Sequence, residues 1–211
     1  MRDAFADTFA RHGDAGAAVC VYQGGQPVVD LAAGVTAAGR PYARETIQPF
    51  MSVSKGIVAI AANMLADQGM LDLDAPVARR WPEFAQAGKQ PIPVRWLLTH
   101  QAGLAALDGR LSRTELLSWT PVIEALEDQS PNWPPGTAHG YHSMTYGFLV
   151  GEVIRRVTGQ FPGPWIARAR TGRKPEPAAS YESFTSDLRL PGDTTVVGGQ
   201  EKKPGSRGDV R

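Results

Sequence analysis

Ser52–Gln68, with the sequence SVSKGIVAIAANMLADQ, is the stretch that decides the fold. From Lys55 onward its apolar residues recur at helical spacing and occupy most of the circumference, which predicts a central α-helix that ends near Gly69. At its start Ser52 and Lys55 are three residues apart, close to one helical turn, so their side chains share one face. The stretch therefore predicts a helix that presents a hydroxyl and an amine side by side.

This pair of side chains has the chemistry of an activated nucleophile. A serine alcohol is a weak nucleophile at neutral pH and needs an adjacent base to take its proton. A lysine in a dry, crowded site can be that base, because desolvation favours the neutral amine. The structural alternative is an ordinary helix start at which Ser52 caps backbone N–H groups. The tetrapeptide Ser52–Lys55 alone does not decide between the two interpretations.

Shorter elements are expected on both sides of this helix. Residues 3–12 have the pattern of a short amphipathic helix, and residues 17–23 and 27–33 read as two strands joined by a tight turn. After the Ser52 helix, the pattern predicts further helices at residues 93–100, 114–127 and 144–157, with a Pro/Gly-rich loop at 131–140 that leads to Tyr141.

Composition excludes several classes of function. The 211 residues carry a net charge of +1 and 42% hydrophobic residues, which is ordinary for a globular protein and gives no argument for nucleic acid or a membrane surface. The single cysteine, Cys20, is expected to be buried on a strand and cannot form an internal disulfide. The first twenty residues lack the apolar core of a secretory signal, so we expect a cytoplasmic protein.

The composition changes after about residue 161. Residues 162–211 are rich in Pro, Gly and Arg and lose the apolar periodicity, so we expect a disordered tail there, after a domain at 1–161. A change of this kind is typical of a shifted reading frame in GC-rich coding sequence. We therefore expect a tail that is unrelated to the domain before it.

Three further motifs give the Ser52–Lys55 pair its context. They are LLTHQAGL at 97–104, PGTAHGYHS at 135–143 and the run GFLVGEVI at 147–154 that continues to VTG at 157–159. In this order the four motifs resemble the serine β-lactamase superfamily, in particular class C-like β-lactamases and the related family VIII-type esterases. The resemblance covers roughly residues 1–160 and implies a helix-rich α/β (α+β) fold of the β-lactamase/transpeptidase type, with an N-terminal β-hairpin. The family's C-terminal sheet strands are missing from the pattern, so the resemblance implies an incomplete domain, truncated after about residue 160.

The resemblance also implies catalytic roles. Ser52 matches the nucleophile that forms an acyl-enzyme, and Lys55 matches the base that deprotonates it. Tyr141 matches the tyrosine of the Y-x-N element, which passes a proton to the leaving group; a phenol beside a lysine is expected to have a lowered pKa. The backbone N–H of Ser52 would be one donor of the oxyanion hole.

Two departures from the family pattern shape the functional prediction. Ser143 stands where the family's Asn helps to bind the substrate amide, which favours a small ester over a lactam. The family's late K-T-G strand has only two weak counterparts, Arg170-Thr171-Gly172 and Lys203-Pro204-Gly205, and proline cannot donate to a sheet ladder. The expected function is a serine hydrolase for small esters. The alternative is a non-catalytic remnant, or a penicillin-binding-type module that acylates without turnover.

Other readings of the polar residues are weaker. His139 and His142 lack the accompanying carboxylate or cysteine ligands of a metal site, and we expect no metal or cofactor. A triad of His100 with Ser52 lacks the G-x-S-x-G turn of such enzymes. The expected partner is a small-molecule ester or lactam, with no nucleic acid and no membrane; the sequence predicts no oligomeric state.

Overall fold

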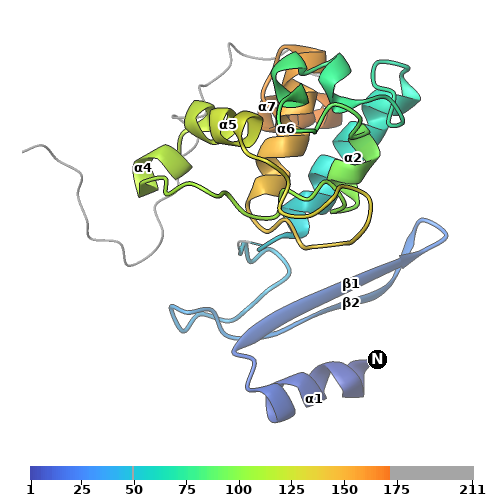
Figure 1. Ribbon diagram of the computed structural model, residues 1–211. Helices are drawn as coiled ribbons and strands as arrows, with labels where there is room; N and C mark the ends of the chain where they lie inside the picture. The colour runs from blue at the N-terminus through green and yellow to red at the C-terminus, as the bar shows by residue number, and fades with distance from the viewer. Residues whose placement is uncertain (49, 172–211) are drawn as a thin grey trace, which may run out of the picture. The chain divides into compact units, whose positions relative to one another are not determined.

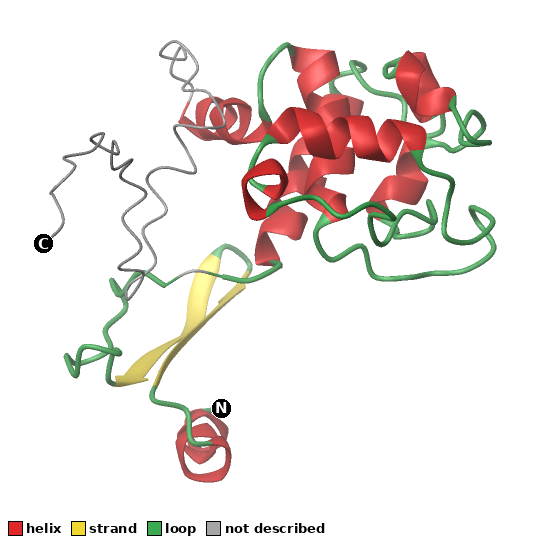
Figure 2. Ribbon diagram, turned by 60° about the vertical axis from the view of Figure 1, so that its left-hand side comes forward, coloured by secondary structure: helices red, strands yellow, loops and turns green. Residues whose placement is uncertain are grey.

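The computed structural model describes residues 1–48 and 50–171, and these fall into two compact units, one that ends at Met51 and one that begins at Ser52. Figure 1 labels the elements in chain order, and Figure 2 shows that the strands are confined to the first unit while the second is built from helices and loops. The helix-rich α+β fold with an N-terminal hairpin agrees with the prediction.

The first unit consists of helix α1 (Arg2–His12) and an antiparallel hairpin of β1 (Gly16–Gln23) and β2 (Gln26–Gly34). Gly24 and Gly25 connect the strands, and both have positive φ angles, 58° and 78°, which tight hairpin turns favour and glycine adopts without strain. Within the described residues the sheet has these two strands.

The prediction that Cys20 is buried is wrong, because the structure leaves this residue exposed. Successive side chains of a strand point to opposite faces. Cys20 shares the more open face of β1 with Ala18, whereas Val19 between them is partly buried.

The second unit is held together by two long helices, α2 (Val53–Asp67) and α6 (Thr145–Thr158), which pack against each other. Helices α3 (Val94–Leu98), α5 (Trp119–Asp128) and α7 (Pro162–Thr171) contact α6, and two 3-10 turns, η1 (Val77–Arg79) and η2 (Pro82–Ala85), precede them. The largest apolar side chains of this core are fully buried: Leu65, Trp81, Phe84, Leu97, Leu126, Leu149 and Ile154.

Helix α2 is less central than its composition indicates. Ala61, Ala62 and Leu65 are buried, but the opposite face leaves Ile57 49% and Ile60 61% exposed. The core of the unit covers only one face of the helix. The exposed face instead borders a shallow apolar cavity of about 250 Å³ that residues of α7 complete.

The helix predicted at 114–127 is divided in two. Helix α4 (Arg113–Leu116) ends before Ser118, and α5 begins at Trp119. A continuous helix would place Pro121 in its interior, where proline removes a hydrogen bond and its ring clashes with the carbonyl of Leu117. With the break, Pro121 falls in the first turn of α5, where proline is tolerated.

Helix α7 lies beyond residue 161, where the sequence predicts the start of a disordered tail. The helix forms because Trp165 has a core to pack against and is buried. Its ten residues therefore belong to the folded part of the second unit. The rest of the predicted tail lies outside the described residues.

Helix α6 is anchored by a buried carboxylate that sequence reasoning did not identify. Glu152 is fully buried, and its oxygens accept hydrogen bonds from Trp119 Nε1, Arg155 Nε and Arg156 Nε, each at 2.7 Å. Burial alone would raise the pKa of Glu152, but the bonds from Arg155, Trp119 and Arg156 outweigh it and hold the pKa below its usual range. The ionised carboxylate thus joins α6 to α5.

Candidate active site

Ser52 occupies an unusual position at the start of α2. It is the residue before the first helical turn, and its backbone is left-handed, with φ 62° and ψ −14°. For a residue other than glycine this conformation is strained, and such strain often marks functional sites. The Ser52 side chain makes no capping hydrogen bond to the helix. The capping alternative therefore does not describe this serine.

The Ser52 hydroxyl instead meets the other two predicted catalytic side chains. Tyr141 donates its phenolic O–H to Ser52 Oγ at 2.7 Å, and Lys55 Nζ donates to the same oxygen at 3.3 Å. The Lys55 amine also lies 4.9 Å from the centre of the Tyr141 ring. Residues 52, 55 and 141 thus converge on one oxygen, and all three belong to the second unit.

The electrostatics of Tyr141 have the direction that the sequence predicts. The hydrogen bonds with Ser52 and then Lys55 hold the pKa of the phenol below its ordinary value, and the positive charge of Lys55 acts in the same sense. A phenol with a lowered pKa gives up and regains its proton more readily near neutral pH. The three groups can therefore pass a proton among themselves.

Ser143 enters the site through its main chain. Its carbonyl oxygen accepts a hydrogen bond from Lys55 Nζ at 2.7 Å, which fixes the amine beside Ser52. The residue also borders an open cavity of about 500 Å³, together with Met144, Phe148 and apolar residues of the 105–122 segment. The predicted substrate-binding role of its side chain stays a prediction.

Two loops carry Tyr141 to Ser52. The segment 100–104 and the segment 132–142 are joined by main-chain hydrogen bonds, Asn132 N to Gly103 O at 2.6 Å, Gly136 N to Gln101 O at 2.9 Å and Gly140 N to His100 O at 3.1 Å. Two tryptophan rings pack directly on glycines of the second loop. A Cβ on Gly136 would lie 2.4 Å from the Trp96 ring, and one on Gly140 would lie 2.3 Å from the Trp133 ring. These glycines let the loop lie close to its neighbours.

His142 and His100 are placed differently from the two alternatives that the sequence raised. His142 is fully buried, and both of its ring nitrogens have protein partners, Gly140 O at 2.6 Å and Leu104 N at 3.0 Å, so neither is available to a metal. Within the described residues no cluster of three or more His, Cys, Asp or Glu side chains could hold a metal ion. His100 Nδ1 accepts the backbone N–H of His142 at 3.0 Å, an arrangement unlike that of a triad base.

The candidates for a third motif do not form a strand in the described structure. Arg170 and Thr171 end helix α7, while Gly172 and residues 203–205 lie outside the described residues.

Among the described residues, 1–48 and 50–171, no helix has the length and apolar character needed to span a membrane.

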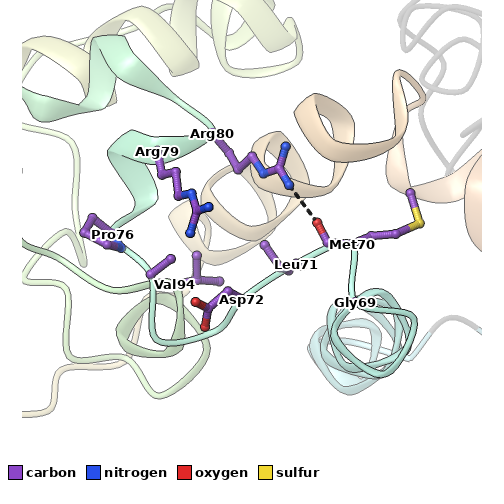
Figure 3. A pocket seen from close by; sticks show the side chains of 9 residues that line it. Gly69, Met70, Leu71, Asp72, Pro76, Arg79, Arg80 and Val94 are labelled. Atoms are coloured by element: carbon purple, nitrogen blue, oxygen red, sulfur yellow. Dashed lines mark hydrogen bonds between the residues drawn. The ribbon is translucent and has the colours of Figure 1, made fainter.

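A separate pocket of about 100 Å³ lies beside η1 and contains none of the predicted site residues. Figure 3 shows Arg79 and Arg80 above Met70, Leu71 and Asp72, with Arg80 Nη2 donating to Met70 O at 3.1 Å. Because Arg80 is already bonded to the main chain, we interpret this pocket as a structural junction between α2 and η1.

The chain is similar to known proteins over most of its length. The family model described as Beta-lactamase matches residues 1–168. The esterase/beta-lactamase LipL of Mycobacterium tuberculosis is 37% identical over 159 residues, which are 74% of this chain and 37% of that protein. Esterase EstB of Burkholderia gladioli is 34% identical over 168 residues, 72% of this chain and 40% of that protein.

A solved structure gives the same result. The crystal structure of a family VIII carboxylesterase superposes with a TM-score of 0.73 at 40% identity, over 79% of this chain and 46% of that one. The chain therefore spans less than half of the length of each of these three proteins.

Proposed function

The chain belongs to the Beta-lactamase family, and on that premise we propose that it is a serine hydrolase that cleaves small esters through an acyl-enzyme on Ser52. The observation that carries the proposal is the convergence of two proton-carrying groups on one serine oxygen, Tyr141 at 2.7 Å and Lys55 at 3.3 Å. A nucleophile within hydrogen-bond reach of its base is the arrangement that covalent catalysis requires.

The proposed acylation step moves one proton and exchanges one bond. Ser52 Oγ attacks the ester carbonyl carbon as its proton passes to the Lys55 amine. The negative charge that develops on the carbonyl oxygen is stabilised by the Ser52 backbone N–H. Tyr141 protonates the departing alkoxide as the carbon–oxygen bond breaks, and the proton on Lys55 then restores the phenol. Water later releases the acid from Ser52 by the reverse route.

Ester substrates are favoured over lactams by two features. Ser143 lacks the amide with which an asparagine would bind a lactam amide, and its carbonyl is committed to Lys55. The cavity beside Ser143 and Met144 is lined largely by apolar side chains, which suit the hydrocarbon part of an ester. The name of EstB, an esterase, supports the same choice, and the name of LipL, an esterase/beta-lactamase, includes it.

A second candidate is a module that acylates without turnover. It is favoured because residues 1–48 and 50–171 hold no strand beyond β1 and β2, and the family's third motif, carried on such a strand, normally supplies a further oxyanion donor. Loss of one such donor costs on the order of 10²–10³ in rate. Acylation with slow release would be the expected consequence.

The test compares wild-type protein with Ser52→Ala and with Ser54→Ala, a matched serine in the same tetrapeptide whose side chain is exposed. Each protein is incubated with p-nitrophenyl butyrate and with nitrocefin, and product and protein mass are followed. Turnover of the ester that Ser52→Ala abolishes and Ser54→Ala leaves intact supports the esterase. An acyl adduct on Ser52 without turnover supports the second candidate. Equal activity in all three proteins refutes both.

A further inference from the structure

The residues before and after Tyr141 are both hydrogen-bonded to His100. The proposed catalytic roles do not explain these two bonds. Gly140 N donates to His100 O at 3.1 Å, and His142 N donates to His100 Nδ1 at 3.0 Å. The Tyr141 side chain between them is 55% exposed. Neighbouring residues cover less than half of this side chain, so the position of its phenol depends strongly on how the neighbouring main chain is held.

The buried His142 ring closes this connection. Its Nε2 accepts the backbone N–H of Leu104 at 3.0 Å, so this nitrogen carries no proton. Its Nδ1 lies 2.6 Å from the carbonyl oxygen of Gly140 and must therefore be the donor. The His100 Nδ1 accepts a hydrogen bond, so its proton lies on Nε2. Each imidazole has to be neutral, and each in a defined tautomer, for every bond to form.

Resting on the proposed function, we propose that His142, with His100, is the positioning device for the reaction: its neutral ring locks the 100–104 and 140–142 segments together and thereby sets the Tyr141 phenol on Ser52. His142 touches no reacting atom, so its role is exerted through Tyr141. The ring of His100 supports the phenol directly, with the ring centroids of His100 and Tyr141 5.1 Å apart.

The surroundings keep both imidazoles neutral. Burial lowers the pKa of His142, helped by the nearby His100, against an opposing effect of the Gly140 carbonyl. Burial also lowers the pKa of His100, and Lys55 and His139 add to the effect. Among the described residues, the phenols of Tyr141 and Tyr146 also face the His100 ring. A proton on His142 Nε2 would face the Leu104 N–H, donor against donor, and open the connection.

The experiment compares His142→Leu, His142→Gln and, as a control for the same type of change, His12→Gln, where the histidine is exposed at the end of helix α1. Leucine removes both ring hydrogen bonds, whereas the side-chain oxygen of glutamine can still accept the Leu104 N–H. The first readout is the rate at which Ser52 reacts with a fluorophosphonate. A displacement of about 1 Å can cost on the order of 10²-fold in rate, so we expect that loss in His142→Leu, a smaller loss in His142→Gln and none in the control.

Two readouts do not depend on activity. The pKa of Tyr141 can be measured by absorbance, as the difference between each protein and the same protein with Tyr141→Phe. In His142→Leu this pKa should rise toward the ordinary value of about 10. Imidazole ¹⁵N NMR of the wild-type protein should show His142 protonated at Nδ1 and not at Nε2. If wild-type Ser52 fails to react, the proposed function is wrong, and these two measurements still decide the role of His142. A natively folded His142→Leu with unchanged rate and unchanged Tyr141 titration, or an Nε2-protonated His142, overturns the proposal.

Discussion

The buried carboxylate of Glu152 should be the most sensitive point in the second unit, and Glu152→Gln tests this. The substitution keeps the shape but replaces an acceptor oxygen with an NH₂ group that faces the guanidinium donors of Arg155 and Arg156. Removing one partner of a buried ion pair costs about 3–5 kcal/mol. The side chains of Arg155 and Arg156 are 39% and 22% exposed, so the freed guanidinium groups regain water. We therefore expect Glu152→Gln to lower the free energy of unfolding by about 3 kcal/mol, the lower end of this range.

The assay is urea unfolding followed by circular dichroism at pH 7. With a slope of about 2 kcal/mol per molar urea, a loss of this size lowers the midpoint by about 1.5 M. It is also a large part of the total of about 5–15 kcal/mol that holds a domain folded. Glu124→Gln, the same change at an exposed position of α5, is the control and should shift the midpoint very little.

The pH dependence gives a second check on Glu152. Its pKa is lowered in the folded protein, so the carboxylate stabilises the fold at neutral pH, and this contribution is lost as the pH falls below the unfolded value and through the folded one. The difference between wild type and Glu152→Gln should therefore shrink in acid. A midpoint shift at pH 7 equal to that of Glu124→Gln would refute the assignment of Glu152 as the anchor of α6.

Three further predictions concern the site. Tyr141→Phe should lower kcat for p-nitrophenyl butyrate by about 10²–10⁴-fold with little change in KM, because it removes the proton carrier and leaves the ring in place; an unchanged kcat would remove Tyr141 from the mechanism. Gly140→Ala should lower both activity and thermal stability, since the new Cβ would lie 2.3 Å from the Trp133 ring, while Gly109→Ala, which meets no atom within 4 Å, should do neither; equal effects of the two would contradict the close approach. The free energy of unfolding should fall as the pH drops below about 6.5, because the pKa of His142 is lowered in the folded state and the unfolded chain then binds the proton more readily. Urea midpoints at pH 7.5 and 5.5 measure this, and a pH effect of equal size in His142→Gln would exclude His142 as its source.

Much of the local structure could be predicted from the sequence. Helical periodicity marked α2 and α6, and the Gly24-Gly25 pair marked the hairpin, because turn chemistry and apolar spacing act over a few neighbouring residues. The boundaries failed where a distant contact or a steric clash decided them. Pro121 divided the predicted 114–127 helix, and the burial of Trp165 placed a helix where composition predicted a tail.

The sequence by itself determined the local pairing in the candidate site: Ser52 and Lys55 are three positions apart, which puts a hydroxyl and an amine on one helical face. Only the tertiary structure decided that the backbone of Ser52 is left-handed, that its hydroxyl does not cap the helix, and that this hydroxyl meets a phenol 89 residues away. It also decided that His142 is buried with both ring nitrogens hydrogen-bonded, and that the buried Glu152 joins α6 to α5. The reason is physical: spacing along a helix is a local property, whereas burial and hydrogen-bond pairing depend on which distant segments fold against each other.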